Sequence, residues 1–405
     1  MKTGALMQLS SICNLNMGQS PDSSSYNQDG EGLPFFQGNA DFGDLHPKVR
    51  YWCNRPTKIA KAGDILLSVR APIGALNIAT EECCIGRGLA ALSVKENVSD
   101  TRYLLYALRS RVDELVAKGT GSTFKAISKT TLEDIRIPLP VLVKQREIAK
   151  QLDKLSALVA LRKQQIEQLD LLIKSRFIEM FGDPQAPSLH PVVSLETVAN
   201  IVSGITKGRK VPIERLHSVP YMRVANVKDG YIDLSEIKMI EVTDSEIERY
   251  RIIPGDILMT EGGDPDKLGR GAIWIHQIDN CIHQNHIFRV RLQREKVNPL
   301  YFVEYLKQPM IKQYFFSCAK QTTGIASINM SQLKAAPTIV PPLDLQNAFA
   351  AFVGQVDKSK FISLTSQLNS ILRSILNFVV IHEDKSEQST RLWYNIMEFK
   401  KLKSG

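Results

Sequence analysis

The sequence predicts a mixed α/β chain of the α+β class, in which two similar globular domains are separated by two long helices that pair as an antiparallel coiled coil. The first observation is an internal repeat. Gly63-Asp-Ile-Leu66 returns as Gly255-Asp-Ile-Leu258, and the proline-leucine-glutamine pattern of residues 140–145 returns at residues 341–346. The second is that each copy leads into a long helical pattern. A duplicated unit of this length indicates two related domains with pseudo-twofold symmetry rather than a solenoid.

Length and composition set the broad class. The chain has 405 residues, of which 43% are hydrophobic and 23% charged, and its formal net charge is +9. The length allows two or three domains, and the basic balance favours a polyanionic partner. Because no apolar run of eighteen residues or signal peptide occurs, we expect a cytoplasmic protein with no membrane segment. The six cysteines show no CxxC spacing, which predicts reduced thiols and neither zinc nor another cofactor.

The first domain is expected over residues 1–143. Runs rich in β-forming residues, separated by turn residues, predict strands at Ile65–Val69 and Leu89–Val94. Apolar residues on one face predict a helix over Tyr103–Val116. The segment Pro138–Pro140 ends the domain.

A long helix is expected over residues 144–183. Arg162 and Arg176 occupy two positions of a seam whose apolar members recur at steps of three and four: Leu152, Leu155, Val159, Ile166, Leu169, Ile173 and Met180. Most such stripes are the buried face of a helical bundle. The length and the second copy favour a coiled coil. Gly182-Asp-Pro184 ends the helix.

The second half repeats this plan. A domain over residues 188–342 is expected to carry a helix after Pro299 and strands at Tyr221–Val224, Asp256–Thr260 and Gly271–Ile275. A second long helix over residues 345–380 has apolar residues from Phe361 to Phe378 at the same spacing, and the tail over residues 381–405 is left unassigned. A rod of two such helices spans about one to two turns of B-DNA.

Several segments carry a resemblance to a known family: Gly18–Tyr26, Gly63–Gly74, Cys84–Ala91, Gly121–Ser128, and Ile137–Pro140 with Gln145–Ile148. Together with the architecture, they resemble the specificity subunits of type I restriction–modification enzymes, over the chain to about residue 380. The second half departs more, because Glu261-Gly-Gly-Asp264 stands where Arg70-Ala-Pro-Ile73 stood. That divergence fits a second domain that reads another sequence.

The resemblance implies a non-catalytic subunit with two target-recognition domains. Each would read one half of a bipartite, asymmetric site in double-stranded DNA, and the helices would set the spacer between the halves. Two methyltransferase subunits would carry methyl transfer and dock on the outer faces of the helices, and restriction/translocase subunits would carry cleavage.

Base recognition uses paired donors and acceptors: Arg or Lys for guanine, Asn or Gln for adenine. Loops of the first domain offer Gln19, Ser20, Tyr26, Gln37, Asn39, Arg50, Arg70, Arg87, Ser122, Thr123 and Lys125. Loops of the second offer Lys207, Arg209, Lys210, Arg223, Asn226, Lys228, Arg270, Gln284 and Asn285. Taken singly, most such residues are solvated or stabilise turns. The loop Gly204–Lys210, with three cations, is better explained as a phosphate clamp, whereas Gly119–Thr123 with Lys125 is either a second clamp or a structural turn.

The alternative is an enzyme, either a single-chain nuclease or a methyltransferase with duplicated DNA-binding domains. Asn298-Pro-Leu-Tyr301 is similar to the Asn-Pro-Pro-Tyr motif of amino-methyltransferases, but it lacks the second proline and a glycine-rich cofactor loop, so a helix start explains it better. His283 and His286 have no further metal ligands at suitable spacing, and Asp264-Pro-Asp-Lys267 indicates a tight turn more than a nuclease centre. A third option, a scaffold with incidental basic charge, is separated by the salt dependence of DNA binding.

Overall fold

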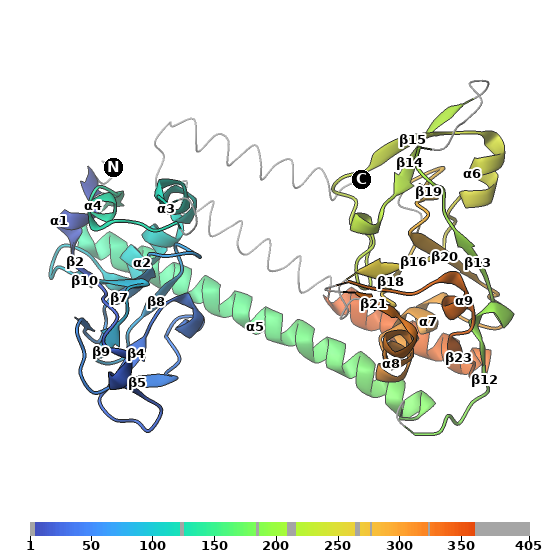
Figure 1. Cartoon of the computed structure of the whole chain (residues 1–405), viewed down its shortest axis with the longest axis horizontal. Coiled ribbons are helices and arrows are strands. Elements are labelled where there is room, and N and C mark those ends of the chain that lie inside the picture. The colour runs from blue at the N-terminus through green and yellow to red at the C-terminus, as the bar shows by residue number, and fades with distance from the viewer. Residues whose placement is uncertain are drawn as a thin grey trace. The chain divides into compact units, whose positions relative to one another are not determined.

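The computed structural model describes residues 5–121, 125–183, 186–208, 216–263, 268–275, 278–322 and 325–360 (Figure 1). The chain divides into two compact units, with the boundary between Leu161 and Arg162. This boundary falls within one long helix, so the helix contributes its first half to the first unit and its second half to the second.

The first unit consists of short strands and short helices followed by the long helix. In chain order the elements are β1 (Ala5–Gln8), α1 (Leu9–Ile12), β2 (Cys13–Met17), β3 (Tyr26–Asn27), β4 (Leu33–Phe36), β5 (Tyr51–Cys53), β6 (Ile59–Ala60), β7 (Ile65–Ser68), β8 (Leu76–Ile78), β9 (Cys83–Ile85), β10 (Leu89–Val94), α2 (Thr101–Arg109), α3 (Val112–Lys118), α4 (Lys129–Glu133), β11 (Arg136–Leu139) and α5 (Leu142–Phe181). Short 3-10 turns, η1 (Ser23–Ser25) and η2 (Asn39–Asp41), interrupt the loops.

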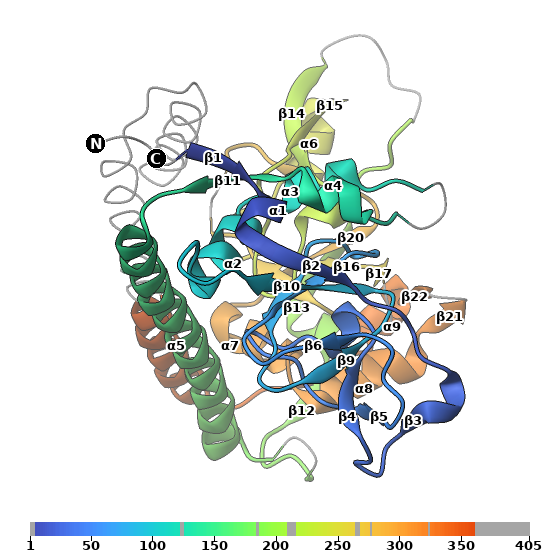
Figure 2. The same cartoon turned by 90° about the vertical axis from the view of Figure 1, so that its left-hand side faces the viewer.

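Two main sheets organise this unit (Figure 2). One is antiparallel with strand order β2-β10-β7-β8, and the other has the order β3-β5-β4-β9-β6, in which β4 and β9 are parallel. In addition, β1 pairs with β11, so that Ala5 lies opposite Leu139. The first strand of the unit and the strand that precedes α5 therefore belong to one ladder.

Strand β7 shows why its sequence is continuously apolar. Ile65 and Leu67 pack into the core that includes α2 and the start of α5, whereas Leu66 packs with Phe36 and Ala91 in a separate core on the opposite face. A strand buried on both faces has no solvent-facing positions. The expected strands at Ile65–Val69 and Leu89–Val94 are confirmed as β7 and β10.

The single helix expected over Tyr103–Val116 is wrong, because the chain forms two helices there, α2 and α3. The backbone leaves the helical conformation at Arg111, with φ −115° and ψ 16°. The break brings Val112 against Gly74, where an added Cβ would lie 2.7 Å from Val112 Cγ1. Periodicity did not reveal the break because Leu108 and Leu115 are both buried on either side of it.

The second unit contains the remaining elements. They are β12 (Val192–Ser194), η3 (Leu195–Thr197), β13 (Ala199–Ser203), β14 (His217–Met222), η4 (Val224–Asn226), β15 (Lys238–Val242), α6 (Asp244–Tyr250), β16 (Ile257–Thr260), β17 (Gly262–Gly263), β18 (Gly271–Ile273), β19 (Ile282–His283), β20 (Ile287–Leu292), α7 (Pro299–Leu306), α8 (Pro309–Cys318), β21 (Lys320–Thr322), β22 (Ile325–Ser327), α9 (Met330–Lys334) and β23 (Pro337–Ile339). Residues 343–360 are also helical.

The main sheet of the second unit has the order β13-β20-β16-β18, which corresponds strand for strand to β2-β10-β7-β8. The parallel pair β14-β19 corresponds to β4-β9, and the β12-β23 ladder corresponds to β1-β11. The strands expected from Asp256 and from Gly271 are confirmed as β16 and β18. The strand expected at Tyr221–Val224 is wrong in extent, since β14 begins at His217 and Val224 already belongs to η4.

The second half of α5 packs against the helical residues 343–360 within the second unit (Figure 1). The Phe349 ring lies 5.4 Å from that of Phe181 and 5.5 Å from that of Phe177, and Lys360 Nζ lies 2.7 Å from an Asp170 carboxylate oxygen. Rising numbers on one helix meet falling numbers on the other, so the two segments run antiparallel.

The expected helix over residues 144–183 is confirmed as α5, and all nine expected seam positions from Leu152 to Met180 are buried or half-buried. Residues 361–380, with the second seam, lie outside the described residues, as does the tail. Among the residues that the structure describes, no helix is both long enough and apolar enough to span a membrane.

Candidate nucleic-acid interface

The repeated Gly-Asp-Ile-Leu motif forms the same turn in both units. Gly63 and Gly255 have φ of 85° and 90°, a conformation that favours glycine. The following carboxylates are buried: Asp64 Oδ2 accepts the Lys61 N–H and Asp256 Oδ2 accepts the Ile253 N–H, each at 2.8 Å. The motif therefore fixes the start of the central strand, β7 or β16.

At the other end of these strands, backbone hydrogen bonds within each unit show which residues of the two units are equivalent. Val69 N donates to Gly88 O, and Glu261 N donates to His286 O. Glu261 thus corresponds to Val69, and Gly262 rather than Glu261 occupies the place of Arg70. The sequence comparison, which placed Glu261 opposite Arg70, was wrong by one residue.

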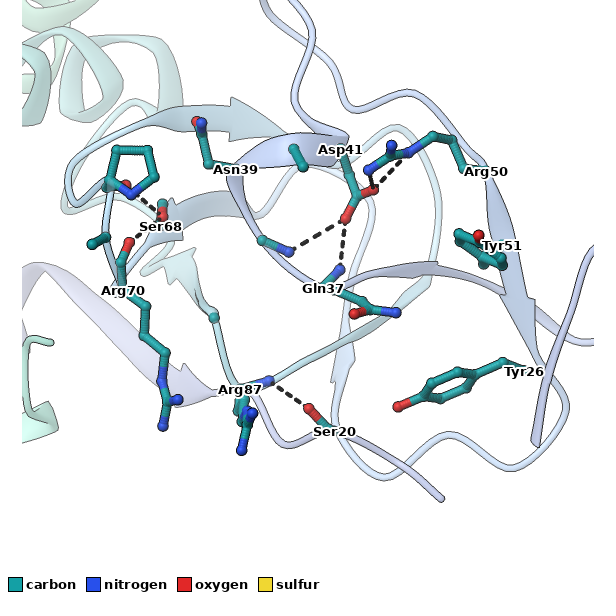
Figure 3. A pocket seen from close by; sticks show the side chains of 15 residues that line it. Ser20, Tyr26, Gln37, Asn39, Asp41, Arg50, Tyr51, Ser68, Arg70 and Arg87 are labelled. Carbon is teal, nitrogen blue, oxygen red and sulfur yellow. Dashed lines mark hydrogen bonds and ion pairs between the residues drawn. The ribbon is translucent and has the colours of Figure 1, made fainter. Parts of the chain in front are cut away.

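A concavity of about 740 Å³ opens on the first unit, at the ends of β2, β4, β7 and β9 (Figure 3). The parallel pairing of β4 with β9 brings the loop after β4 beside the loop after β9. Of the eleven first-domain residues selected from sequence, seven line this concavity: Ser20, Tyr26, Gln37, Asn39, Arg50, Arg70 and Arg87. The structure therefore gathers residues that are up to 67 positions apart in the chain.

Arg70 and Arg87 supply positive charge at this site. Both side chains are exposed and extend to the same side of the concavity in Figure 3. Neither forms an ion pair with a residue that the structure describes. Lys125 lies next to Arg70, because its carbonyl oxygen accepts the Ala71 N–H at 3.2 Å. Three exposed cations in adjacent loops create a surface that attracts phosphate groups.

Asp41 organises the loop that carries Gln37 and Asn39. Its carboxylate, 4% exposed, accepts the backbone N–H groups of Gln37 at 2.7 Å and Gly38 at 3.3 Å. The Arg50 guanidinium donates to the same carboxylate through Nε, at 3.0 Å, and through Nη2. The hydrogen bond to Asp41 raises the pKa of Arg50. Arg50 is therefore committed to supporting the loop.

Tyrosines form another part of the wall. The Tyr26 ring lies 4.6 Å from that of Phe35, and its hydroxyl donates to Pro21 O at 2.9 Å. Burial raises the pKa of Tyr26. Tyr51 lines the same concavity. Sequence reasoning missed Tyr51 and Asp41, since a single Tyr in a strand and a single Asp in a polar loop carry no local signal.

The other first-domain candidates lie beside the concavity or outside the described residues. The exposed Gln19 is fixed through its backbone, which donates to Ile85 O and accepts from Thr57 Oγ1 at 2.7 Å. Ser122 and Thr123 lie outside the described part of the chain.

The second-unit candidates are more often paired. Arg223 Nη2 lies 3.3 Å from Glu236 Oε2, which lowers the pKa of Glu236, and Lys228 Nζ lies 3.9 Å from Asp233 Oδ2. Arg270, Gln284 and Asn285 are half-buried, and Lys207 is exposed. Arg209 and Lys210 lie outside the described residues, so the phosphate clamp at Gly204–Lys210 stays a prediction.

Asn226 does not lie where the sequence reasoning expected it. Its side chain is 3% exposed, accepts the Arg223 N–H at 2.9 Å, and donates to the carbonyl oxygens of Asp233 and Glu236 at 2.8 and 3.0 Å. With its amide satisfied by backbone groups, it supports the loop and is not available to a base.

The motifs set aside as structural are explained by local contacts. Asn298 caps α7, accepting the N–H groups of Leu300 and Tyr301. His283 is fully buried between Tyr250 O and Val202 O, at 3.0 and 3.2 Å. Strands β19 and β20 flank Gln284, which forms an isolated bridge with Ile205, and a turn at Asn285 and His286. Asp264–Lys267 lies outside the described residues, and the residues that the structure describes contain no group of three or more candidate metal ligands.

All six cysteines are free. Burial raises the pKa of Cys13, Cys83 and Cys281 to about 12 and that of Cys84 to about 11. Thiols held in the protonated form are poor nucleophiles. The vicinal pair Cys83-Cys84 accordingly serves packing, with Cys83 and Cys84 on opposite sides of β9.

Comparison with known proteins assigns the segment that carries this concavity. Residues 1–171 match the family model of the type I restriction modification DNA specificity domain. The N-terminal segment is similar to a specificity domain of this family. The matched segment contains all of β1 to β11 and the first part of α5, and so every element that surrounds the concavity.

Relatives of the specificity domain extend the likeness. A putative type I restriction enzyme MjaX specificity subunit from Methanocaldococcus jannaschii is 45% identical over 154 residues, which cover 38% of this chain. The chain spans about a third of that relative's length, 36%. The type I restriction enzyme EcoBI specificity subunit from Escherichia coli is 22% identical over 405 residues, covering 92% of this chain and 82% of that protein.

A solved structure is similar to this chain over both units and not only over residues 1–171. The type I restriction-modification system S subunit from M. genitalium matches with a TM-score of 0.54 at 16% sequence identity. The match covers 94% of this chain and 96% of that chain. The two chains therefore share a mixed helix and strand fold.

Proposed function

We propose that this chain is the sequence-specific DNA-binding subunit of a type I restriction–modification complex and recognises a bipartite, asymmetric site. The observation that carries the proposal is the concavity of the specificity domain, where Gln37 and Asn39 lie beside the exposed cations Arg70 and Arg87. Phosphate contacts supply most of the affinity for DNA, and amide or guanidinium contacts to base edges supply the sequence choice.

The second unit is proposed as the reader of the other half-site. Its main sheet repeats the strand order of the first, which supports a pseudo-twofold internal repeat. The antiparallel packing of residues 343–360 against α5 supports an antiparallel coiled coil as the element that sets the spacer. The domains would then be residues 1–143 and 188–342, joined by helices at 144–183 and 345–380.

The proposed partners are double-stranded DNA, two methyltransferase subunits and restriction/translocase subunits, in the cytoplasm. This chain would carry no catalytic group of its own. Leu161, Leu171 and Leu172 are about half exposed on α5, outside the seam. Apolar residues on the outer face of a helix support the idea that the methyltransferase subunits dock there.

The test exchanges residues 1–143 with those of a relative of different specificity and reads genome-wide methylation by single-molecule sequencing. One half of the methylated motif should change, while the other half and the spacer stay constant. A change in both halves, or no bipartite motif with the unaltered chain, would contradict the proposal. Adding a heptad within residues 144–181 should lengthen the spacer, and an unchanged spacer would remove the role of the helices.

A further inference from the structure

The loops that follow β4 and β14 occupy equivalent places in the two units. Phe36 on β4 lies opposite Ile85 on the parallel strand β9, and Met222 on β14 lies opposite His283 on the parallel strand β19. The next backbone bonds also correspond, because Gly86 N donates to Phe36 O at 2.8 Å and Gln284 N donates to Met222 O at 2.9 Å. Gln37 and Arg223 are therefore the first residues beyond equivalent strands.

In each loop, a buried side-chain oxygen accepts the N–H group of the first loop residue, and the two side chains, Asp and Asn, have the same shape. The Asp41 carboxylate accepts the Gln37 N–H at 2.7 Å, and the Asn226 amide oxygen accepts the Arg223 N–H at 2.9 Å. Downstream, Asp41 O accepts Lys48 N at 2.8 Å and Asn226 O accepts Asp233 N at 2.7 Å. The loops of residues 37–50 and 223–236 are thus two versions of one construction.

The first residue of each loop is also held firmly. In the first unit, a Cβ added to Gly88 would overlap Gln37 O, and one added to Gly86 would lie 3.0 Å from Gln37 Cα, so the backbone of Gln37 lies directly against this glycine segment. The Gln37 side chain itself is exposed and faces the concavity (Figure 3). In the second unit, the Arg223 guanidinium donates to Glu236 O at 3.2 Å and pairs with its carboxylate.

We propose that Gln37 is a specificity-determining residue of the first unit and reads an adenine, whereas Arg223, at the equivalent position of the second unit, is bonded to Glu236 and supports its loop. The inference rests on the proposed function. A Gln amide matches the N6 and N7 edge of adenine, and a guanidinium matches the O6 and N7 edge of guanine. Asp41 is a positioning residue, since it acts through the backbone of Gln37.

The experiment uses the chain assembled with its methyltransferase partners and reads motifs from single-molecule methylation sequencing. Gln37→Arg should shift one position of one half-site from A·T toward G·C, with a preference changed by about tenfold or more. Gln28→Arg is a matched control, because Gln28 is exposed in the same unit and does not line the concavity.

Two further variants keep the outcome decisive. Gln37→Ala removes the amide without adding charge, so it should relax the same position even if the arginine variant fails to assemble. Asp41→Asn should lower the rate of methylation at every site and leave the preferred bases unchanged.

The possible failures are distinguishable. No bipartite motif from the unaltered complex would contradict the proposed function itself. A normal motif that neither Gln37 variant alters would overturn this inference and leave the proposed function standing, as would a motif altered by Asp41→Asn alone.

Discussion

Each unit contains a four-stranded sheet with the same strand order, but one face of this sheet is covered differently in the two units. The register pairs Ile65 with Leu92 and Ile257 with Val290, so Ala91 and Ser93 of the first unit correspond to Arg289 and Arg291 of the second. Ala91 packs among apolar residues against the second sheet. Arg289 instead donates to Asn200 Oδ1 and to the carbonyl oxygens of Arg249 and Arg251, at 3.0 to 3.2 Å.

Arg291 completes this polar face, because it holds both oxygens of the Asp256 carboxylate at 2.8 Å. Burial lowers the pKa of Arg289, a cost that two backbone carbonyl groups and Asn200 Oδ1 offset. The hydrogen-bonded frame is therefore kept while a face of the sheet is rebuilt to hold the segment after α6. Shared backbone contacts, rather than shared side-chain packing, make the two units similar.

The largest expected effect tests the glycines that follow β2 and β13, Gly18 and Gly204. A Cβ on Gly18 would overlap Gly86 O, and one on Gly204 would overlap His283 O, both backbone atoms that cannot rotate away. Gly18→Ala and Gly204→Ala should each lower the free energy of unfolding by about 3 kcal/mol, measured by urea titration with hydrogen exchange to localise the loss. Gly38→Ala is the control, since nothing lies within 4 Å of its added Cβ. A large effect in one unit only would break the equivalence.

A pH titration should separate the units. Burial lowers the pKa of His283 to about 4, despite two carbonyl acceptors that oppose the shift, whereas Ile85 fills the equivalent place in the first unit. The unfolded chain then binds the extra proton between about pH 6.5 and 4. Stability of the second unit should fall by roughly 3 kcal/mol as the pH drops through that window. Hydrogen exchange at pH 7 and pH 5 in β20 and β10 checks this, and equal losses in both strands would contradict it.

The glutamine at the start of each long helix should matter next. Gln145 is fully buried and bonds Val98 O, Pro140 O, Ser99 Oγ and Asp100 N, and Gln346 bonds Lys296 O, Pro341 O and Asn298 N. Gln145→Met and Gln346→Met leave these groups unsatisfied at similar side-chain volume. Each should cost about 2–3 kcal/mol in urea unfolding. A near-zero cost for either would show that one helix is not tied to its unit this way.

The smallest expected effect is a change in stability that has opposite signs at equivalent helix positions of the two units. Asp153 accepts hydrogen bonds from Arg102 and from the Tyr106 hydroxyl, at 2.7 Å for the latter. Its counterpart at the same spacing from Gln346 is Gly354, where an added Cβ meets open space. Gly354→Ala should stabilise the helix by about 0.5–1 kcal/mol, and Asp153→Ala should destabilise by about 1 kcal/mol. Thermal unfolding of both variants measures the signs, and a destabilising Gly354→Ala would be the contrary result.

Repetition in the sequence predicted the parts of the fold that depend on local rules. Gly63-Asp64 and Gly255-Asp256 repeat in sequence and form the same turn, because a left-handed glycine and a carboxylate that accepts a backbone N–H suffice to make it. The three-four spacing predicted α5 to within a few residues, since periodicity and length decide a helix of that kind. Neither kind of signal exists for the break at Arg111, which depends on Val112 meeting the distant Gly74.

The sequence predicted which residues gather at the candidate site, but not which of them face the concavity and which support the loops. Seven selected residues meet in the concavity, because polar residues between short apolar strands gather where the strands end. Asn226 and Arg50 were selected as readers although they support loops, since an amide or a guanidinium looks the same in sequence whether it is buried or exposed. Asp41 was missed because its role depends on Arg50 and on backbone groups folded around it.

The pairing of β1 with β11, and of β12 with β23, has a consequence for how such chains change over generations. Each module enters and leaves through neighbouring strands, with Ala5 beside Leu139 and Val192 beside Ile339. A gene segment that encodes everything between these strands can be exchanged by recombination without redirecting the helix that follows. Under the proposed function, exchange of one such segment changes one half-site and leaves the other half-site and the helices as they are.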